Sequence, residues 1–277
     1  MDDASEVLAR FSAPTRDWFT GAFAEPTAAQ TGAWSAISSG EHALVVAPTG
    51  SGKTLAAFLW ALDSLLTPGR ELVPAPSAAP DSSSSAAVIR PASAGPAAVP
   101  AVERCRVLYV SPLKALAADV ERNLRSPLVG IRQAATRAGL ELADVQVGMR
   151  TGDTPPAERR AFATRPPDIL ITTPESLFLI LTSAARAGLA GVRTVILDEI
   201  HAVAGTKRGA HLAVSLERLD AMLDHPGGPG PAQRVGLSAT VRPVDAVARF
   251  LGGGRSPVDG GRRVVVVQPP STKRIEV

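Results

Sequence analysis

The chain contains little cysteine and few aromatic residues. Only one of its 277 residues is cysteine, Cys105, and only 4% are aromatic. A single cysteine excludes a disulfide within the chain, and its place in the apolar run CRVLYV predicts a buried core thiol. With so few aromatic side chains the core must be mainly aliphatic, which suits a buried parallel sheet covered by helices.

The chain also lacks the sequence features of an exported or membrane protein. No uninterrupted apolar run reaches the ~18 residues of a membrane span. The acidic start MDDASEVLARF has neither the basic residues nor the apolar block of a signal peptide. We therefore expect a cytoplasmic protein with no membrane partner. The formal net charge of +3 is a mild basic excess, which permits nucleic-acid binding without establishing it.

Short apolar runs rich in β-branched residues alternate with helical patterns. This alternation indicates βαβ units and a mostly parallel sheet, so the predicted class is α/β with helices on both faces. The expected strands are Ala43–Ala47, Arg106–Val110, Val145–Met149, Ile169–Thr172, Thr194–Asp198, Arg234–Ser238 and Arg263–Val267. The expected helices include Leu55–Leu66, Ala115–Ala138, Pro156–Ala163, Glu175–Ser183, His211–Leu223 and Val244–Leu251. Trp34 and Trp60 lie on helical patterns and are expected in the core or at an interface.

Residues 67–102 differ from the rest of the chain in composition. They are dense in proline, alanine and serine and carry almost no periodic apolar face. Such a segment cannot offset its ordering entropy by burial, so we expect a disordered surface insertion.

The segment APTGSGKT, residues 47–54, follows an apolar strand and precedes a helical pattern. It fits the Walker A pattern except that Ala47 replaces the usual first glycine. Gly50 and Gly52 allow the backbone to curl so that its N–H groups face the phosphates of ATP. Lys53 is expected to neutralise phosphate charge, and the Thr54 hydroxyl to ligate Mg²⁺. A plain glycine-rich turn is the alternative. The residues assigned to ATP by this loop are Thr49, Gly50, Ser51, Gly52, Lys53 and Thr54.

The segment TVILDEIH, residues 194–201, reads as a buried strand that ends in two carboxylates. Ligands of open α/β folds bind at the carboxyl ends of the strands, so Asp198 is expected to face Thr54. Asp198 would hold Mg²⁺, mainly through water, and Glu199 would orient or deprotonate the attacking water. Alone, Asp-Glu after an apolar run is usually just a strand end. Together with the Walker A pattern it indicates nucleoside triphosphate hydrolysis, with Lys53, Asp198 and Glu199 as catalytic residues.

From Phe19 to about Val267, leaving the insertion aside, the chain resembles the first RecA-like motor domain of superfamily 2 DEAD/DEAH-box-like helicases. The likeness is specifically to the large helicase-related (Lhr) family, and it rests on motifs in the family's order. These are FAEPTAAQTGAW (the Q motif region), SPLKALAADV (Ia), RTGDT and ITTPESL (Ib and its neighbours), DEIH (II) and SAT (III). The continuation HAVAGTKRGAHLAVSLERLD is the most family-specific stretch.

The resemblance implies roles for further residues. Gln30 would read the adenine edge, with Phe23 or Thr27 shaping the base pocket. His201 would link the ATP site to Ser238 and Thr240, which transmit hydrolysis to strand movement. The residues expected to contact nucleic acid are Pro112, Lys114, Thr151, Gly152, Thr173, Pro174, Glu175 and Arg208.

Several of these residues have simpler readings. A glutamine such as Gln30 is often an ordinary helix-surface residue. TPES also reads as a helix start, with Thr173 at the cap, Pro174 in the first turn and Glu175 behind it, and capping is compatible with phosphate contact. For Lys207 and Arg208 two interpretations are equally good: solvated surface charges, or residues that bind nucleic acid or a partner domain. His201 is not spaced as a zinc ligand with His211 or Cys105.

The resemblance implies that residues 1–277 form the first RecA-like, ATP-binding domain of a helicase. Nothing after SAT resembles the helicase motifs of the second RecA-like domain, so we expect that domain to be absent from this sequence. The expected function is the ATP-binding lobe of an ATP-dependent 3′-to-5′ helicase or translocase in genome maintenance. Its expected substrate is single-stranded or tailed duplex DNA, or an RNA–DNA hybrid. The rival is a solitary module that binds ATP–Mg²⁺ and nucleic acid but hydrolyses little. A third alternative is another P-loop enzyme such as a kinase, against which Glu199 and the SAT motif argue.

Overall fold

The computed structural model describes residues 3–67, 104–254 and 261–270. Apart from Thr67, the predicted insertion 67–102 lies outside the described residues. Within the described residues seven strands form one sheet in the order β3-β4-β2-β5-β6-β1-β7, and every neighbouring pair is parallel. The strands are β1 His42–Val46, β2 Val107–Val110, β3 Val147–Arg150, β4 Ile169–Thr172, β5 Thr194–Leu197, β6 Gln233–Ser238 and β7 Val264–Val267.

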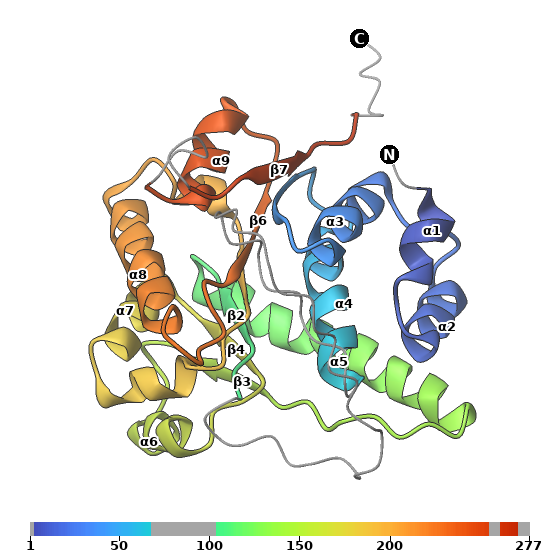
Figure 1. Ribbon diagram of the computed structural model, residues 1–277, viewed down its shortest axis with the longest axis horizontal. Helices are drawn as coiled ribbons and strands as arrows, with labels where there is room; N and C mark the ends of the chain where they lie inside the picture. The colour runs from blue at the N-terminus through green and yellow to red at the C-terminus, as the bar shows by residue number, and fades with distance from the viewer. Residues whose placement is uncertain (1–2, 68–103, 255–260, 271–277) are drawn as a thin grey trace.

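Helices cover both faces of the sheet (Figure 1). One face carries α1 Ala4–Ala9, α2 Ala13–Ala22, α3 Ala28–Ser38, α4 Lys53–Leu66 and α5 Lys114–Arg137. The other carries α6 Pro156–Thr164, α7 Pro174–Leu181, α8 Lys207–Leu223 and α9 Val244–Gly252, with the short 3-10 helices η2 Ala184–Leu189 and η3 Ile200–Ala202. The predicted arrangement, a parallel sheet with helices on both faces, is confirmed.

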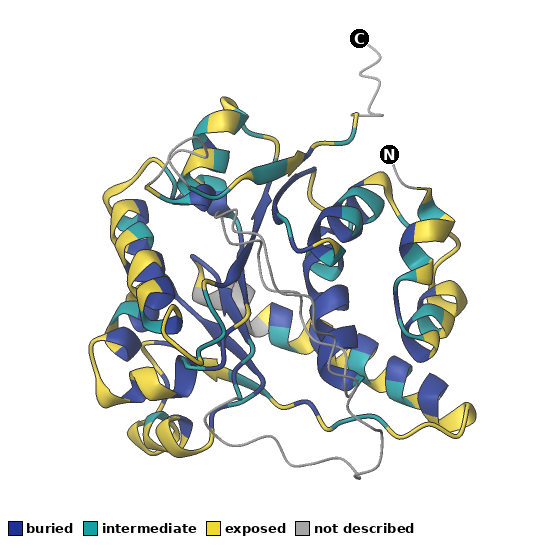
Figure 2. Cartoon of the chain, in the orientation of Figure 1, coloured by how far each residue is buried: buried dark blue, intermediate teal, exposed yellow. Residues whose placement is uncertain are grey.

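Side chains of the central strands alternate between two aliphatic cores. In β1, Ala43 and Val45 pack under α1–α5, whereas Leu44 and Val46 pack under α6–α9. All five residues of β1 are buried, and Figure 2 shows the central strands as the most enclosed part of the chain. Burying one such branched side chain fully stabilises the fold by about 1.5–3 kcal/mol, which explains the near-continuous apolar runs of these strands.

The expected strands all form, with ends within two residues of those predicted. Among the helices, α8 is the exception, because it starts at Lys207 rather than His211. Its N-cap is Thr206, whose side chain accepts a hydrogen bond from the Gly209 amide. A glycine in the first turn weakens the helical pattern in the sequence, but Gly209 packs so closely on the Val203 carbonyl that a Cβ would lie 2.0 Å from that oxygen.

The core predictions for single residues also hold. Cys105 and Trp34 are fully buried and Trp60 is buried to all but 7% of its surface, and the Trp34 indole donates a hydrogen bond to the Ala56 carbonyl at 3.0 Å. No helix in the described part of the chain is long and apolar enough to cross a membrane.

Candidate active site

The strand order brings the sequence motifs to one edge of the sheet. All strands are parallel, so the segments that follow them emerge at the same carboxyl edge. The loop 47–54 follows β1, SAT follows β6 and DEIH follows β5, and these three strands are consecutive in the sheet. The segments after β2, β4 and β3, which carry all the expected nucleic-acid residues except Arg208, lie on the other side of β5 along that edge. The two sets of predicted residues therefore form two adjoining halves of one surface.

The loop between β1 and α4 has the backbone of a phosphate-binding loop. Gly50 and Gly52 adopt φ of +82° and +79°, the left-handed region that glycine occupies without a Cβ penalty. Gly52 is the N-cap of α4, so the amides of the first helical turn, including that of Thr54, have no partner within the helix. This end of α4 carries the positive part of the helix dipole and suits an anion.

Lys53 lies inside this loop rather than in solvent. Its Nζ donates to the carbonyls of Ala47 at 2.7 Å and Pro48 at 2.9 Å, and the residue is 8% exposed. Burial lowers the pKa of the ammonium, while the nearby carboxylates of Glu199 and Asp198 act in the opposite direction. The cation is therefore held at the loop by carbonyls and faces the two acidic residues.

The same loop holds a buried hydroxyl that has no partner. Ser51 Oγ is shielded from solvent and makes no hydrogen bond with the described residues. An unsatisfied buried hydroxyl costs free energy, and a phosphate oxygen would accept a hydrogen bond from it. The fit of the loop to ATP thus rests on an orphaned donor as well as on the glycines.

The Q motif region packs directly on the phosphate loop. Thr27 caps α3 and forms a capping box with Gln30, in which Thr27 N–H donates to Gln30 Oε1 at 2.9 Å. Thr27 Oγ1 also donates to the Ser51 carbonyl at 3.0 Å. A Cβ on Gly52 would lie 2.6 Å from Gln30 Nε2, so the buried amide lies against the loop. Phe23 is 42% exposed at the end of α2 and packs on Phe19.

Asp198 and Glu199 lie beside this loop. Asp198 is 8% exposed, and its two oxygens accept hydrogen bonds from the Tyr109 hydroxyl and from the Glu199 amide, the latter at 2.9 Å. Burial, followed by the charge of Asp198, raises the pKa of Tyr109, so its hydroxyl stays protonated and donates. Glu199 has a φ of +44°, a left-handed conformation that costs a non-glycine residue about 1–3 kcal/mol. Such strain is typical of functional positions.

His201 connects these carboxylates to the SAT segment. Its Nδ1 lies 3.3 Å from Glu199 Oε2 and also 3.3 Å from the amide nitrogen of Ala239, which donates to it. The Ser238 hydroxyl donates to the Ala239 carbonyl at 2.8 Å, and the Ser238 carbonyl accepts from the Ala47 amide at 3.1 Å. Because Nδ1 cannot both accept from Ala239 and donate to Glu199, the ring has two alternative partners. Thr240 is exposed beyond this chain of contacts.

The expected nucleic-acid residues are placed unevenly. Thr173 caps α7, with Pro174 in the first turn, as the sequence predicts. Thr151 is buried in a turn in which its amide donates to Thr154 Oγ1, and Gly152 is exposed. Pro112 is buried, so the structure gives it no exposed side chain. Lys114 begins α5, but its side chain lies outside what the structure describes.

Glu175 and Arg208 form a bidentate ion pair between α7 and α8. Arg208 Nε donates to Glu175 Oε1, and Nη2 donates to Oε2 at 2.9 Å. Hydrogen bonding from Arg208 lowers the pKa of the Glu175 carboxyl. Sequence reasoning assigned both residues to the same surface but missed this pair, because 33 positions separate them.

Sequence reasoning also missed Tyr109. It is the only tyrosine in the chain, and it lies in the middle of an apolar strand where its ring reads as core. The parallel pairing of β2 with β5 brings its hydroxyl to Asp198. No signal in the local sequence distinguishes this hydroxyl from a simple core contact.

A divalent cation would need few protein ligands here. Among the described residues, no three His, Cys, Asp or Glu side chains gather as a metal site. Asp198 follows β5, and Thr54 lies in the first turn of α4 after β1, with only β6 between these two strands. Hard oxygen ligands of this kind suit Mg²⁺ that is also bound by phosphate. The donor set therefore fits a metal that arrives with the nucleotide.

Comparisons with known proteins agree with this geometry. The DEAD/DEAH box helicase family matches residues 27–247. The chain is 56% identical over 99% of its length to a Lhr helicase and probable uracil glycosylase of Mycolicibacterium smegmatis, and 36% identical over 98% to an ATP-dependent helicase Lhr-Core of Methanocaldococcus jannaschii. It spans 16% and 28% of those two relatives.

A solved structure gives the same result. The Mycobacterium smegmatis helicase Lhr, determined with ssDNA and AMP-PNP, superimposes with a TM-score of 0.78 at 56% identity. The match covers 96% of this chain and 29% of that one.

Proposed function

The chain belongs to the DEAD/DEAH box helicase family, and from this membership we propose that it is the ATP-binding motor lobe of an Lhr-type ATP-dependent helicase. The predicted RecA-like fold and the predicted resemblance to Lhr helicases are both confirmed. The observation that carries the proposal is the adjacency of β1, β6 and β5, which brings the phosphate loop, SAT and DEIH to one sheet edge.

In the proposed nucleotide site each residue has a distinct role. Lys53 neutralises the β- and γ-phosphates, and the amides of residues 49–54 donate to them. Glu199 positions and deprotonates the attacking water, in a conformation that the backbone holds under strain. Thr54 and Asp198 would hold Mg²⁺, which supplies charge neutralisation at the phosphates. The residues assigned to the adenine side are Phe23, Thr27 and Gln30.

The adjoining half of the edge is proposed to hold a nucleic-acid strand by its backbone. Hydroxyls, amides and a guanidinium contact phosphates without reading base sequence. Glu175 is assigned to this surface through its pair with Arg208. A relative was solved with ssDNA, which supports DNA as the substrate. RNA–DNA hybrid, 3′-to-5′ movement and a role in genome maintenance are further parts of the proposal. The residues assigned to this surface are Pro112, Lys114, Thr151, Gly152, Thr173, Pro174, Glu175 and Arg208.

Coupling between the two halves is proposed to run through His201. A change at Glu199 would shift His201 Nδ1 between its two hydrogen bonds, one to Glu199 and the other from the Ala239 amide. The SAT segment, with Ser238 and Thr240, then shifts relative to β1 and β5, the strands on either side of β6. A ring with two alternative partners is a bistable element of the kind that such coupling requires.

Full turnover is proposed to need a second RecA-like domain of a longer protein. Arginine fingers supplied by a partner raise turnover by orders of magnitude in related NTPases. We therefore expect this chain alone to retain under about a hundredth of the motor's turnover. The chain spans only a small part of its relatives, which leaves room for such a domain.

The test compares nucleotide binding with hydrolysis in the isolated chain. We expect wild type to bind a fluorescent ATP analogue, Lys53→Ala to lose that binding, and Glu199→Gln to retain it. Hydrolysis with and without single-stranded DNA should stay near the Lys53→Ala background. A wild type that binds no ATP would refute the proposal. Strand-stimulated turnover that Lys53→Ala abolishes would instead show that one lobe suffices, contradicting only the need for a second domain.

A further inference from the structure

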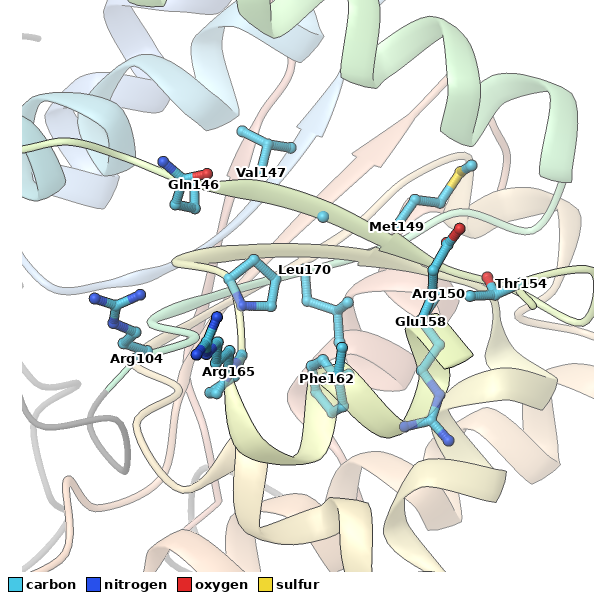
Figure 3. A pocket seen from close by; sticks show the side chains of 14 residues that line it. Arg104, Gln146, Val147, Met149, Arg150, Thr154, Glu158, Phe162, Arg165 and Leu170 are labelled. Carbon is cyan, nitrogen blue, oxygen red and sulfur yellow. The ribbon is translucent and has the colours of Figure 1, made fainter. Parts of the chain in front are cut away.

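A groove of about 440 Å³ runs along the edge strand β3, apart from the nucleotide site (Figure 3). It is bounded by β3, by the prolines that precede β4 and by α6. Gly148 forms part of its floor, where a Cβ would lie 2.8 Å from Pro167. None of the roles in the proposed function uses this groove.

The groove has two arginines at one end, one arginine beside Glu158 at the other, and an apolar middle. Figure 3 shows Arg104 and Arg165 at one end and Arg150 towards the other, with Phe162 and Leu170 between them. Of the residues that line it, Glu158 is the only carboxylate. An elongated anion with an apolar or planar body matches this distribution better than a neutral ligand does.

Arg150 is the clearest sign of a missing partner. Its Nη1 is buried and makes no hydrogen bond within the described residues. The guanidinium lies over the Phe162 ring, 5.3 Å from its centre. Burial, together with the charge of Arg159, lowers the pKa of Arg150. An unsatisfied donor on a desolvated cation is costly. A rotation of the guanidinium towards the groove would let an anionic oxygen there relieve that cost.

The groove is continuous with the surface proposed to hold nucleic acid. Arg150 ends β3, and the turn that follows it carries Thr151 and Gly152. Thr154, at the end of the same turn, lines the groove. A strand that crosses the carboxyl edge over this turn reaches the groove without leaving the protein.

We propose that this groove binds a segment of single-stranded nucleic acid that flanks the motor's own contacts. The arginines take phosphates at its two ends, and the apolar floor takes sugar or base. This inference rests on the proposed function, because it extends the nucleic-acid path of that surface. An acidic peptide is the other occupant that the charges allow, and the experiment distinguishes it from a strand.

The experiment measures the salt dependence of strand binding by fluorescence anisotropy. Strands of about 6 and about 12 nucleotides lie within the usual range of single-strand site sizes. The variant is R104A/R165A, which spares the half-buried Arg150 and so protects the fold. The control is Arg249→Ala, an exposed arginine on α9, which packs on β6 and β7 far from β3 in the sheet.

A plot of log affinity against log salt has a negative slope, and for the longer strand we expect R104A/R165A to reduce its magnitude by about 1.4, or ~0.7 for each phosphate that the two arginines no longer neutralise. The shorter strand and the Arg249→Ala control should keep the wild-type slope, apart from a small general charge effect. An unchanged slope for the longer strand would overturn the inference while leaving the proposed function intact. A wild type that binds neither strand would instead count against the proposed nucleic-acid surface. Binding of a poly-glutamate peptide that needs Arg104 and Arg165, with strand binding unaffected, would assign the groove to a protein partner and also overturn the inference.

Discussion

The hydroxyl of Tyr109 shows how much of the site depends on single atoms. The ring stacks on Phe58 with centres 4.9 Å apart, while the hydroxyl donates to Asp198. With the Glu199 amide on the other oxygen, the carboxylate is held from both sides. In the proposed site it is this carboxylate that would face the metal, so Tyr109 acts as a positioning residue.

We predict that Tyr109→Phe weakens Mg²⁺-dependent binding of an ATP analogue by about five- to tenfold. A hydrogen bond to a charged group is worth about 1.5–3 kcal/mol, and removing it should cost part of that through the orientation of Asp198. Affinity measured in EDTA should not change, because the phosphate loop is intact. Phe58→Leu disturbs the same core without touching Asp198 and is the matched control. Equal decreases with and without Mg²⁺ would mean that the hydroxyl acts on the fold alone.

At the scale of elements, α7 and α8 are joined at their N-termini by Glu175 and Arg208. The pair is exposed, so it contributes at most about 1 kcal/mol to stability. The lowered pKa of Glu175 means that this small contribution is complete above the unfolded pKa of about 4.5. It disappears as the pH falls through the folded value. The pair has a larger effect on Arg208, because Glu175 accepts hydrogen bonds from its Nε and Nη2 and so occupies these donors.

We predict that Glu175→Gln strengthens binding of single-stranded DNA by about two- to fivefold. The change removes a competing negative charge and frees the guanidinium for phosphate. Glu141→Gln, at an exposed glutamate after α5, makes the same change in net charge and should have a smaller effect. Anisotropy titrations at fixed salt measure both. Weaker binding by Glu175→Gln would show that the carboxylate itself contacts the strand.

The elements could be predicted from the sequence far better than their contacts. Apolar runs bounded by polar residues locate each strand, and APTGSGKT and DEIH locate the nucleotide site. The three N-terminal helices are not among the expected helices. α1 has only six residues, and α1 and α2 bury few apolar side chains, such as Val7 and Phe19, so their pattern is weak. Of α3 the sequence shows only a helical pattern around Trp34, without bounds. The Tyr109 and Arg208 contacts depend on strand order and helix packing, which local patterns do not encode.

For the molecule as a whole, a partly buried charge cluster joins α8 to β6 and to the residue before β7. Arg234 in β6 is 1% exposed and donates to Asp220 at 2.6 Å and Glu217 at 2.9 Å, both on α8. Arg262, just before β7, donates to the same two carboxylates. Beside this cluster the Arg234 amide donates to His42 Nδ1 at 2.9 Å. Burial, then the charges of Arg262 and Arg234, lower the pKa of His42 to about 3.

This histidine predicts acid sensitivity of the fold. The unfolded chain takes up a proton at His42 near pH 6.5, and the folded chain resists it down to about pH 3, so stability falls as the pH drops through that range. We expect the free energy of unfolding to decrease by about 1–2 kcal/mol from this group between pH 7 and pH 5, measured by urea titration. His42→Asn should flatten the dependence, whereas His225→Asn, at an exposed histidine, should not. Equal pH dependence in wild type and His42→Asn would contradict the assignment.

The position of β1 between β6 and β7 has a consequence for how the protein is made. Ala43 in β1 pairs with Val235, and the contacts that join these two strands span 192 positions. At about 5–20 residues per second, a ribosome that has made β1 works on for roughly 10–40 s before either neighbour exists. During that time HALVV is an apolar strand with two open edges, the kind of segment that pairs with other chains. Synthesis that stops before Gln233 therefore releases a product whose β1 strand has neither of its partners, and chaperones and proteases should recognise its exposed apolar residues.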